Sequence, residues 1–263
     1  MRAHVLILIM VTTVMGYKVR SLSKIWALNI APNSVDDAYT SCTNEMSKRI
    51  SKCLASDMKT NDDFKTAWNT AKKQVNKKEN PRNGLTVNHA IAIRVYTNEK
   101  PKIYNQFNKA VHDCKDTYKT KFNYHALHFL LTDALKHLKE NQKDQEQCVN
   151  TYRRTNEDFD KNVVNMEIRF GRFTSASLSD SLTRFGQKSC FKIYTCHGAA
   201  LGNYSHLQHE KEVLIPPYEK FEVVSVEVSD KEDRWCDVVY TLTSTGTLSN
   251  LDCALMQNAV CVQ

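Results

Sequence analysis

The stretch HALHFLLTDALKHLKENQKDQEQC, residues 125–148, marks the point where the character of the chain changes. Its leucines recur three or four residues apart, which predicts a helix with one apolar face. They are Leu127, Leu130, Leu131, Leu135 and Leu138. A polar segment follows from residue 139 to residue 147 and ends the helical pattern. We therefore expect helices before this segment and a different kind of structure after it.

The chain before this point is expected to be mostly helical, over about residues 33–146. Asn33 or Ser34 is the expected N-cap of a first helix, because two acidic residues follow it. A second helix is predicted where Phe107, Ala110, Val111 and Cys114 keep helical spacing. Between them, HAIAIRVYT, residues 89–97, is short, branched and apolar, so we predict a strand there.

The chain after this point, about residues 147–263, contains short runs rich in branched and aromatic residues, separated by turn residues. The runs are MEIRFGRFTSASL at 166–178, SCFKIYTC at 189–196, EVLIPP at 212–217, FEVVSVEV at 221–228 and CDVVYTLTST at 236–245. A helical half followed by a strand-rich half predicts an α+β protein. We expect one domain over residues 26–263, because 263 residues with 41% hydrophobic and 25% charged side chains suit a single large core.

The N-terminus, MRAHVLILIMVTTVMGYK, has the features of a secretory signal peptide over residues 1–16, with a cut near Gly16. The alternative is a buried N-terminal strand. The C-terminus, NAVCVQ, lacks a hydrophobic tail, so no lipid anchor and no membrane span are expected. A secreted protein with nine cysteines is expected to contain disulfides, and the odd number leaves one thiol outside them or paired between chains.

Neither metal binding nor nucleic-acid binding is predicted. The sequence has no C-x-x-C and no H-x-x-x-H spacing, so no metal site is expected. The net charge of +7 is concentrated in lysines between Lys48 and Arg82. No base-stacking or helix-turn-helix pattern accompanies that charge, so we interpret it as a solvated surface.

The pair Glu210 and Glu212 in HEKEVLIPP, residues 209–217, points to a candidate site. In an extended chain the two carboxylates would face one way and Lys211 the other. Two carboxylates aimed at one place repel each other unless a cation lies between them. The motif is short and needs support from the rest of the chain.

That support comes from four blocks between Trp26 and Cys253 that together resemble the vertebrate-type, arginine-specific ecto-mono-ADP-ribosyltransferases with an R-S-E-x-E signature. The blocks are ALNIAPNSVDDAYTSC at 27–42, KFNYHALHFLLTDAL at 121–135, IRFGRFTSASLS at 168–179 and HEKEVLIPPYEKFEV at 209–223. The resemblance implies that the helical part packs on a mixed β-sandwich catalytic core of the ADP-ribosyltransferase type. It also implies NAD as a co-substrate and no tightly bound cofactor.

The resemblance also implies roles for individual residues. Arg153 matches the arginine that grips the phosphate and ribose region of NAD, although its type alone would equally suit a surface arginine. Arg154 stands where the family usually has glycine. Ser175 matches the serine that orients the catalytic glutamate and lines the nicotinamide pocket, and Ser177 is its partner in S-x-S; without the resemblance both would be read as a polar strand end. The resemblance implies that both serines bind NAD together with Arg153 and Glu212. Glu212 matches the catalytic glutamate.

The acceptor side of the implied site includes Glu210, which matches the glutamate linked to arginine acceptors. Tyr204, in GNYSHLQ, lies in the segment that resembles the substrate-recognition loop; a buried turn tyrosine is the alternative reading. Asn203 begins the chain's only N-x-S/T sequence, NYS, so it is a possible glycosylation site.

The family's disulfide pattern implies two bonds, Cys42 with Cys253 and Cys148 with Cys196. The sequence does not pair the remaining cysteines, which are Cys53, Cys114, Cys190, Cys236 and Cys261.

The function implied is a secreted enzyme that moves ADP-ribose from NAD to arginine side chains of proteins, with NAD hydrolysis as a side reaction. The expected partners are NAD and arginine-bearing proteins. The alternative is a secreted binding protein that keeps the fold without turnover.

Overall fold

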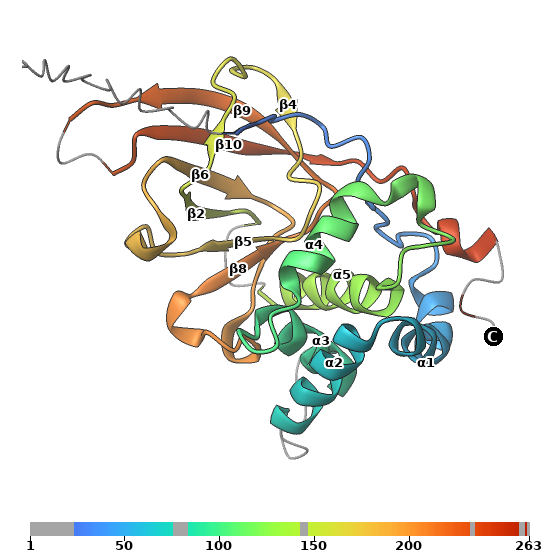
Figure 1. Cartoon of the computed structure of the whole chain (residues 1–263). Helices are drawn as coiled ribbons and strands as arrows, with labels where there is room; N and C mark the ends of the chain where they lie inside the picture. The colour runs from blue at the N-terminus through green and yellow to red at the C-terminus, as the bar shows by residue number, and fades with distance from the viewer. Residues whose placement is uncertain (1–23, 76–83, 143–146, 232–234, 258–260, 262–263) are drawn as a thin grey trace, which may run out of the picture.

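The computed structural model describes residues 24–75, 84–142, 147–231, 235–257 and 261. The predicted signal peptide therefore lies outside the described residues. Helices gather on one side of the molecule and strands on the other (Figure 1). The helices are α1 (Thr43–Thr60), α2 (Asp62–Gln74), α3 (Val87–Thr97), α4 (Tyr104–Asp113) and α5 (His125–Glu140). No helix among the described residues is both long and apolar enough to cross a membrane.

The strands form one mixed eight-stranded sheet in the order β4-β9-β10-β6-β2-β5-β8-β7, with β6 and β10 parallel and the other neighbours antiparallel. A separate parallel pair joins β1 to β3. The α+β prediction is confirmed. The strand bounds are β1 (Ile25–Trp26), β2 (Val149–Thr155), β3 (Asp158–Phe159), β4 (Glu167–Ile168), β5 (Thr174–Ser177), β6 (Ser189–Thr195), β7 (Ala199–Ala200), β8 (Glu212–Ile215), β9 (Glu219–Val228) and β10 (Val238–Thr247).

Three neighbouring strands of this sheet carry the residues of the predicted site. Strand β2 contains Arg153, and it meets β5 at a single pair, Tyr152 with Ser177. Strand β5 contains Ser175 and pairs with β8, where Ser177 lies opposite Glu212. Sheet order therefore brings together residues that are up to 59 positions apart in the sequence.

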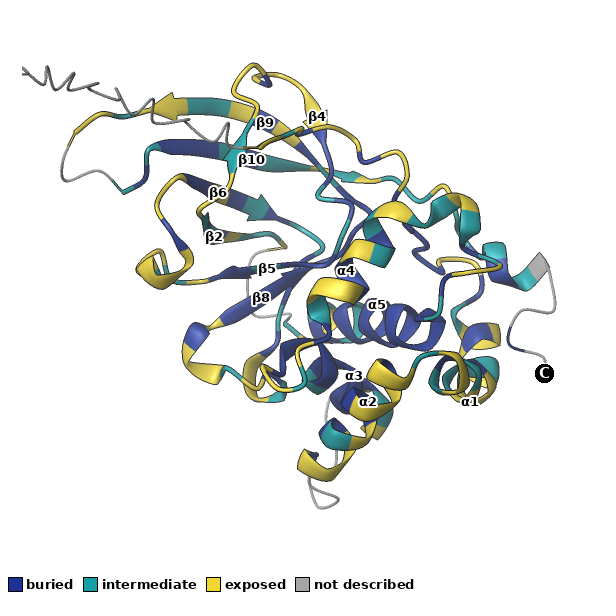
Figure 2. Ribbon diagram, in the orientation of Figure 1, coloured by how far each residue is buried: buried dark blue, intermediate teal, exposed yellow. Residues whose placement is uncertain are grey.

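The helical half is organised around α5, which is buried along most of its length (Figure 2). A helix that is apolar on nearly every side lies inside a protein. Helices α1 and α3 pack on it. The helices predicted from the leucines of residues 127–138 and from Phe107, Ala110 and Val111 are confirmed as α5 and α4.

The strand predicted at residues 89–97 is wrong, because this segment forms most of helix α3. A capping box starts the helix: the Thr86 hydroxyl accepts from the His89 amide, and His89 Nδ1 accepts from the Thr86 amide. The helix is buried on most sides, so most of its residues are apolar and no polar face marks its period. A short apolar run of this kind does not distinguish a buried helix from a buried strand.

The predicted N-cap at Asn33 or Ser34 is also wrong, because the first helix begins at Thr43. The two acids that suggested a first turn bind distant backbone instead. Asp36 accepts from the amides of Asn250 and Leu251 and forms a buried ion pair with Arg169 at 2.6 Å. The segment before α1 is thereby fixed to the C-terminal part of the chain.

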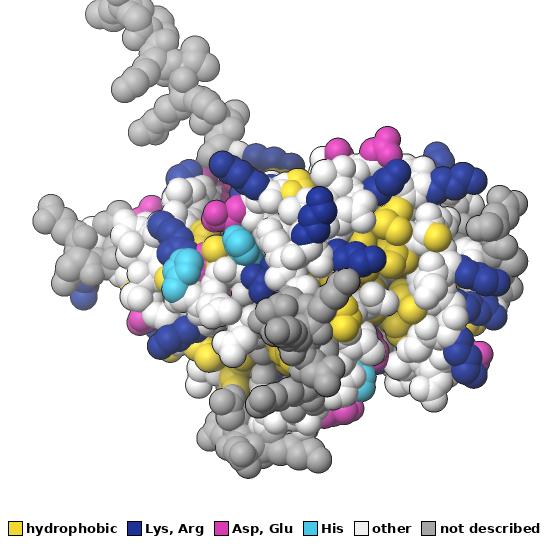
Figure 3. All heavy atoms as spheres, turned by 90° about the horizontal axis from the view of Figure 1, so that it is seen from below, with side chains coloured by type: hydrophobic (Ala, Val, Ile, Leu, Met, Phe, Trp, Pro, Cys, Tyr) yellow, Lys and Arg dark blue, Asp and Glu magenta, His cyan; other side chains and the backbone are white. Residues whose placement is uncertain are grey.

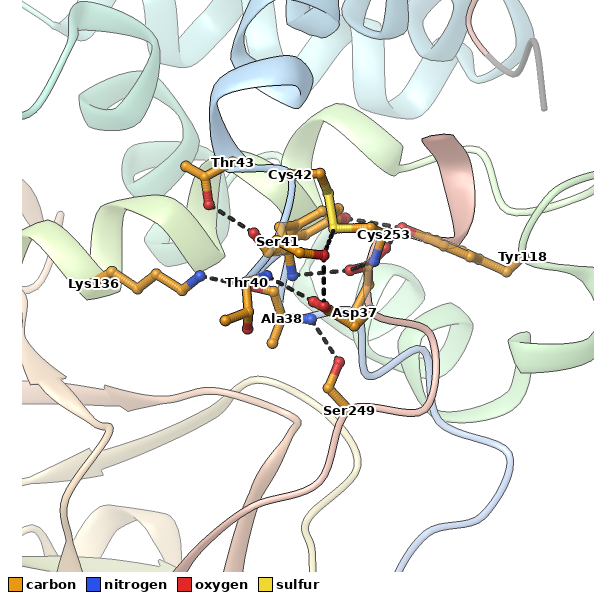
Figure 4. Close-up of a disulfide and its surroundings, with 12 residues drawn as sticks. Asp37, Ala38, Thr40, Ser41, Cys42, Thr43, Tyr118, Lys136, Ser249 and Cys253 are labelled. Atoms are coloured by element: carbon orange, nitrogen blue, oxygen red, sulfur yellow. Dashed lines mark hydrogen bonds between the residues drawn. A yellow bond between two sulfur atoms is a disulfide. The ribbon is translucent and has the colours of Figure 1, made fainter. Parts of the chain in front are cut away.

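A disulfide between Cys42 and Cys253 strengthens this attachment (Figure 4). Beside it, Asp37 accepts from the Cys253 amide at 2.9 Å, and the Ser249 hydroxyl accepts from the Ala38 amide at 3.0 Å. The carboxylates of Asp37 and Asp252 approach the sulfur of Cys253, but that sulfur is held in the disulfide and offers no thiolate to a metal ion.

Three further disulfides are present, and one of them is the second predicted bond, Cys148–Cys196. The other two, which the sequence left unpaired, are Cys53–Cys261 and Cys190–Cys236. Cys114 is a free, half-buried thiol. The Cys148–Cys196 bond joins the residue before β2 to the residue after β6, next to the strand that carries Arg153.

Candidate active site

Glu212, the first residue of β8, is the centre of the candidate site. Its side chain is buried, with 6% of the residue exposed. One carboxylate oxygen accepts from the Ser175 hydroxyl at 2.6 Å, and the other accepts from the Ser205 hydroxyl at 2.9 Å. Burial raises the pKa of Glu212, while these two hydrogen bonds oppose the rise and Glu210 adds to it. The carboxylate is therefore oriented by one donor on each oxygen.

Arg153, on β2, is connected to this carboxylate through Ser175. Its Nη1 donates to the Ser175 carbonyl at 2.7 Å. Burial lowers the pKa of the Arg153 guanidinium, and burial together with the charge of Arg153 lowers the pKa of Arg172. Within the described ranges neither arginine forms an ion pair. The charge of Asp113 reaches Arg172 and opposes this fall. Two neighbouring guanidinium groups that form no ion pair are nevertheless suited to bind an anion.

Helix α3 closes this region with Tyr96. Its hydroxyl donates to the Phe173 carbonyl at 2.9 Å and accepts from the Asn108 amide group at 3.1 Å. Burial raises the pKa of Tyr96 to about 12, so the phenol is neutral at physiological pH. Residues 89–97, which were predicted as a strand, thus form one side of the site as part of helix α3.

Glu210 lies at the end of a short 3₁₀ turn, η4 (Gln208–Glu210), and not on the strand. Its side chain is 11% exposed and forms an ion pair and hydrogen bond with Arg184 Nη2. Its backbone carbonyl accepts from the Ser177 hydroxyl at 2.6 Å. The second serine of S-x-S therefore supports the backbone at Glu210, whereas the first contacts the carboxylate of Glu212.

The simple alternation expected of an extended E-K-E segment does not describe this turn. Lys211 has a left-handed backbone, with φ of 48° and ψ of 48°, and it is exposed. Glu210 and Glu212 are nevertheless both buried, and the charge of Glu210 reaches Glu212. The cation that relieves the repulsion at Glu210 in this structure is the guanidinium of Arg184.

The NYS sequence forms part of another short turn, η3 (Gly202–Tyr204), which precedes Glu210. Asn203 is exposed. Tyr204 is half-buried and packs against the helical core, so the structure places it in the wall between this turn and the helices. Ser205 is 1% exposed, and its hydroxyl both donates to Glu212 and accepts from the Leu207 amide at 3.1 Å.

Arg154 points to a different part of the molecule from its neighbour Arg153, as alternation along β2 requires. Its Nε donates to the Asp180 carbonyl at 2.9 Å, and its Nη1 donates to the Trp235 carbonyl at 3.0 Å. The guanidinium also lies 4.9 Å from the centre of the Trp235 ring. Arg154, at the position where the family usually has glycine, therefore links the loop after β5 to the segment before β10 by hydrogen bonds.

Four residues that the structure places in this site were not identified from the sequence: Tyr96, Arg172, Arg184 and Ser205. Ser205 is the serine of the NYS sequence, but its use as a donor to Glu212 depends on how η3 folds back. Arg184 lies 26 residues before Glu210, in the turn η2 (Thr183–Phe185), and no local spacing links the two.

The lysines and arginines on the face seen in Figure 3 are scattered among acidic and polar side chains. The lysine-rich run that was interpreted as solvated surface lies in part, at residues 76–83, outside the described residues.

Comparison with known proteins relates this geometry to one family. A model described as NAD:arginine ADP-ribosyltransferase matches residues 28–240. Ecto-ADP-ribosyltransferase 5 of Bos taurus is 33% identical over 244 residues, which are 87% of this chain and 74% of that protein. NAD(P)(+)--arginine ADP-ribosyltransferase 2 of Gallus gallus is 32% identical over 238 residues, which are 88% of this chain and 73% of that protein.

Solved structures give the same result. A mutant of the eukaryotic mono-ADP-ribosyltransferase ART2.2, in complex with NADH, superposes with a TM-score of 0.72 and 30% identity, over 86% of this chain and 98% of that one. Another ART2.2 mutant, in complex with NAD, gives a TM-score of 0.70 at 30% identity over the same shares. On the match to the family model and on these relatives, the chain belongs to the NAD:arginine ADP-ribosyltransferase family.

Proposed function

We propose that the protein is a mono-ADP-ribosyltransferase that moves ADP-ribose from NAD to arginine side chains of proteins and releases nicotinamide. The observation that carries this proposal is the Glu212 carboxylate, which receives one hydroxyl donor on each oxygen and senses the charge of Glu210, while Arg153 binds the carbonyl of the donor Ser175. NAD is a co-substrate, and no tightly bound cofactor is invoked.

Glu212 is the catalytic carboxylate in this proposal. Breaking the bond between nicotinamide and ribose produces positive charge on the sugar, as in glycoside cleavage. A preorganised carboxylate stabilises that charge more strongly in the transition state than in the bound substrate. Ser175 and Ser205 fix both oxygens of Glu212, so the carboxylate needs little reorganisation when charge develops.

Arg153 and Arg172 are the proposed anchors for the phosphates of NAD. They are half-buried and lack ion pairs within the described part of the chain, so a dianionic diphosphate would satisfy both. The contact between Arg153 and the Ser175 carbonyl connects this anchor to the strand that orients Glu212. Ser177 acts indirectly, by supporting the backbone of Glu210.

Glu210 is the proposed acceptor-orienting residue. A protonated guanidinium is a poor nucleophile, so a second carboxylate that accepts one of its protons favours attack. In the transfer step, a guanidinium nitrogen bonds to the ribose carbon, the nicotinamide bond breaks and the released proton goes to Glu210. Glu210 already binds a guanidinium in this structure, that of Arg184. When water takes the place of the acceptor, the same site hydrolyses NAD.

The expected partners are NAD and arginine-bearing proteins outside the cell. The ecto-enzyme names of the relatives support an extracellular or cell-surface location. Within it we propose secretion, based on the signal-like residues 1–16. Tyr204 is the aromatic residue we place near the acceptor protein, and Asn203 is exposed as a glycan acceptor would be.

A non-catalytic binding protein is the less favoured candidate. Arg153, Ser175, Glu210 and Glu212 are all present, and the hydrogen bonds among Arg153, Ser175 and Glu212 give the Glu212 carboxylate the fixed orientation that the proposed catalysis needs. A protein that only bound a partner would have no need of a carboxylate oriented on both oxygens.

The experiment that tests the proposed roles compares Glu210→Gln with Glu212→Gln. ADP-ribosyl-agmatine and free ADP-ribose are measured separately from NAD and agmatine. Glu210→Gln should lose transfer to agmatine and keep hydrolysis, whereas Glu212→Gln should lose both. Unchanged transfer in Glu210→Gln would refute the acceptor role, and retained turnover in Glu212→Gln would refute the catalytic role.

A further inference from the structure

The carboxylate assigned to the acceptor arginine is occupied by an arginine of the protein itself. Arg184 Nη2 contacts Glu210 Oε1, and the two form an ion pair. The Glu210 side chain is 11% exposed and the Arg184 side chain is 49% exposed. A half-exposed guanidinium thus reaches from the surface onto a nearly buried carboxylate.

Two neighbours hold the guanidinium in this position. His209 Nε2 lies 3.3 Å from Arg184 Nη2, and the centre of the Phe185 ring lies 4.8 Å from the guanidinium carbon. An aromatic face and a carboxylate are a common binding environment for a guanidinium. The surroundings of Arg184 are therefore chemically those that a substrate arginine would require.

The position of Arg184 depends on the loop that follows β5. Its turn, η2, is followed by Gly186, whose φ of 123° is a backbone conformation that favours glycine. A side chain there would also clash, because an added Cβ would lie 2.4 Å from the Asn156 side-chain oxygen. Earlier in the loop, the Asp180 carbonyl accepts from Arg154 Nε and from the Trp235 indole nitrogen. Arg154 therefore helps to set where the turn that carries Arg184 begins.

We propose that Arg184 is an internal competitor that occupies the acceptor subsite, so that a substrate arginine must displace it from Glu210. This inference rests on the proposed function, because it takes Glu210 as the acceptor-orienting residue. A substrate arginine then binds only to those molecules in which Arg184 has left Glu210, so the apparent affinity for the acceptor is the intrinsic affinity multiplied by the fraction of such molecules. Binding of NAD does not involve this exchange, so Arg184 controls acceptor use and not NAD use.

The test is the Michaelis constant for agmatine in Arg184→Gln, measured at saturating NAD. Glutamine keeps a polar side chain but removes the positive charge. An ion pair between a half-exposed cation and a nearly buried carboxylate predicts that the KM for agmatine falls about three- to tenfold. The KM for NAD and the rate of hydrolysis without agmatine should stay unchanged. Arg184→Lys keeps the charge without the planar fork and should give an intermediate KM for agmatine.

Lys188→Gln is the matched control, because it removes one positive charge from the same region. Lys188 is 45% exposed and pairs with Asp158 at 3.0 Å. This variant should leave the KM for agmatine unchanged. A KM for agmatine that is unchanged or raised in Arg184→Gln would overturn the proposal, because it would show that Arg184 does not compete or that it assists binding. Absence of agmatine transfer in the wild-type protein would instead refute the proposed function.

Discussion

The contact between Ser205 and Glu212 leads to a sharp prediction about catalysis. Ser205→Ala removes the hydroxyl that donates to one oxygen of Glu212, while Ser175 still donates to the other. The residue is 1% exposed, so bulk water does not readily replace the lost donor. The carboxylate then keeps one of its two orienting hydrogen bonds.

The expected loss follows from the strength of that bond. A hydrogen bond to a charged group contributes about 1.5–3 kcal/mol, which corresponds to a fall in kcat of about tenfold to 150-fold if the bond is needed in the transition state. The pKa of Glu212 is already raised by burial, and Ser205 is one of the groups that oppose the rise. Without Ser205 the pKa rises further, so the active carboxylate form is lost at higher pH than in the wild type.

The assay is the pH dependence of kcat/KM for NAD hydrolysis and agmatine transfer. Ser205→Ala should lose more activity at acidic than at alkaline pH, and Ser205→Thr should restore most of it. Because Ser205→Ala also removes the NYS sequence, Asn203→Gln is the control for a glycan. Ser249→Ala, which loses a hydroxyl far from Glu212, is the control for stability. If Ser205→Ala lost the same fraction of activity at every pH, or lost none, Ser205 would not be orienting the Glu212 carboxylate as described.

Three further predictions concern Arg153, Arg154 and Asp37. Arg153→Lys should raise the KM for NAD about tenfold or more, because an ammonium group cannot make the two parallel hydrogen bonds of a guanidinium. A KM for NAD equal to that of the wild type in steady-state kinetics would contradict this prediction. Arg154→Gly should lower the free energy of unfolding by roughly 2–4 kcal/mol, because it removes two hydrogen bonds to backbone carbonyls and introduces a flexible glycine. The KM for NAD should stay unchanged in this variant. Burial raises the pKa of Asp37 from 3.8 to about 7. Between those pH values the folded protein holds a proton that the unfolded chain does not, so the free energy of unfolding falls as pH rises from about 4 to about 7. Asp37→Asn should flatten that slope in urea titrations, and an unchanged slope would show that another group causes it.

Much of the fold was predictable because its signals are local. Leucine spacing identified α5, and short branched runs identified strands β5, β6, β8, β9 and β10. The failures occurred where burial removes the local signal. Helix α3 is apolar on most sides, so periodicity could not identify it. The acids at Asp36 and Asp37 looked like a helix start, but they bind residues more than 200 positions away.

The site was predictable only in part. Resemblance to a family identifies which residues match the family's motifs, but it does not say which other side chains those residues contact in this chain. Arg153, Ser175 and Glu212 lie together, as the resemblance implied, and both implied disulfides are present. Neither the second donor to Glu212 nor the arginine on Glu210 follows from a motif. Each depends on the path of a loop, and a loop path is set by tertiary contacts such as those of Arg154 with Asp180.

Transferase activity is tested by incubating purified, oxidised protein with labelled NAD and agmatine, with Glu212→Ala as the control. ADP-ribosyl-agmatine and free ADP-ribose are quantified separately, and circular dichroism verifies that both proteins are folded. We predict that the wild-type protein forms ADP-ribosyl-agmatine and that Glu212→Ala forms neither product. Neither product from folded wild-type protein, or equal product from Glu212→Ala, would contradict the account.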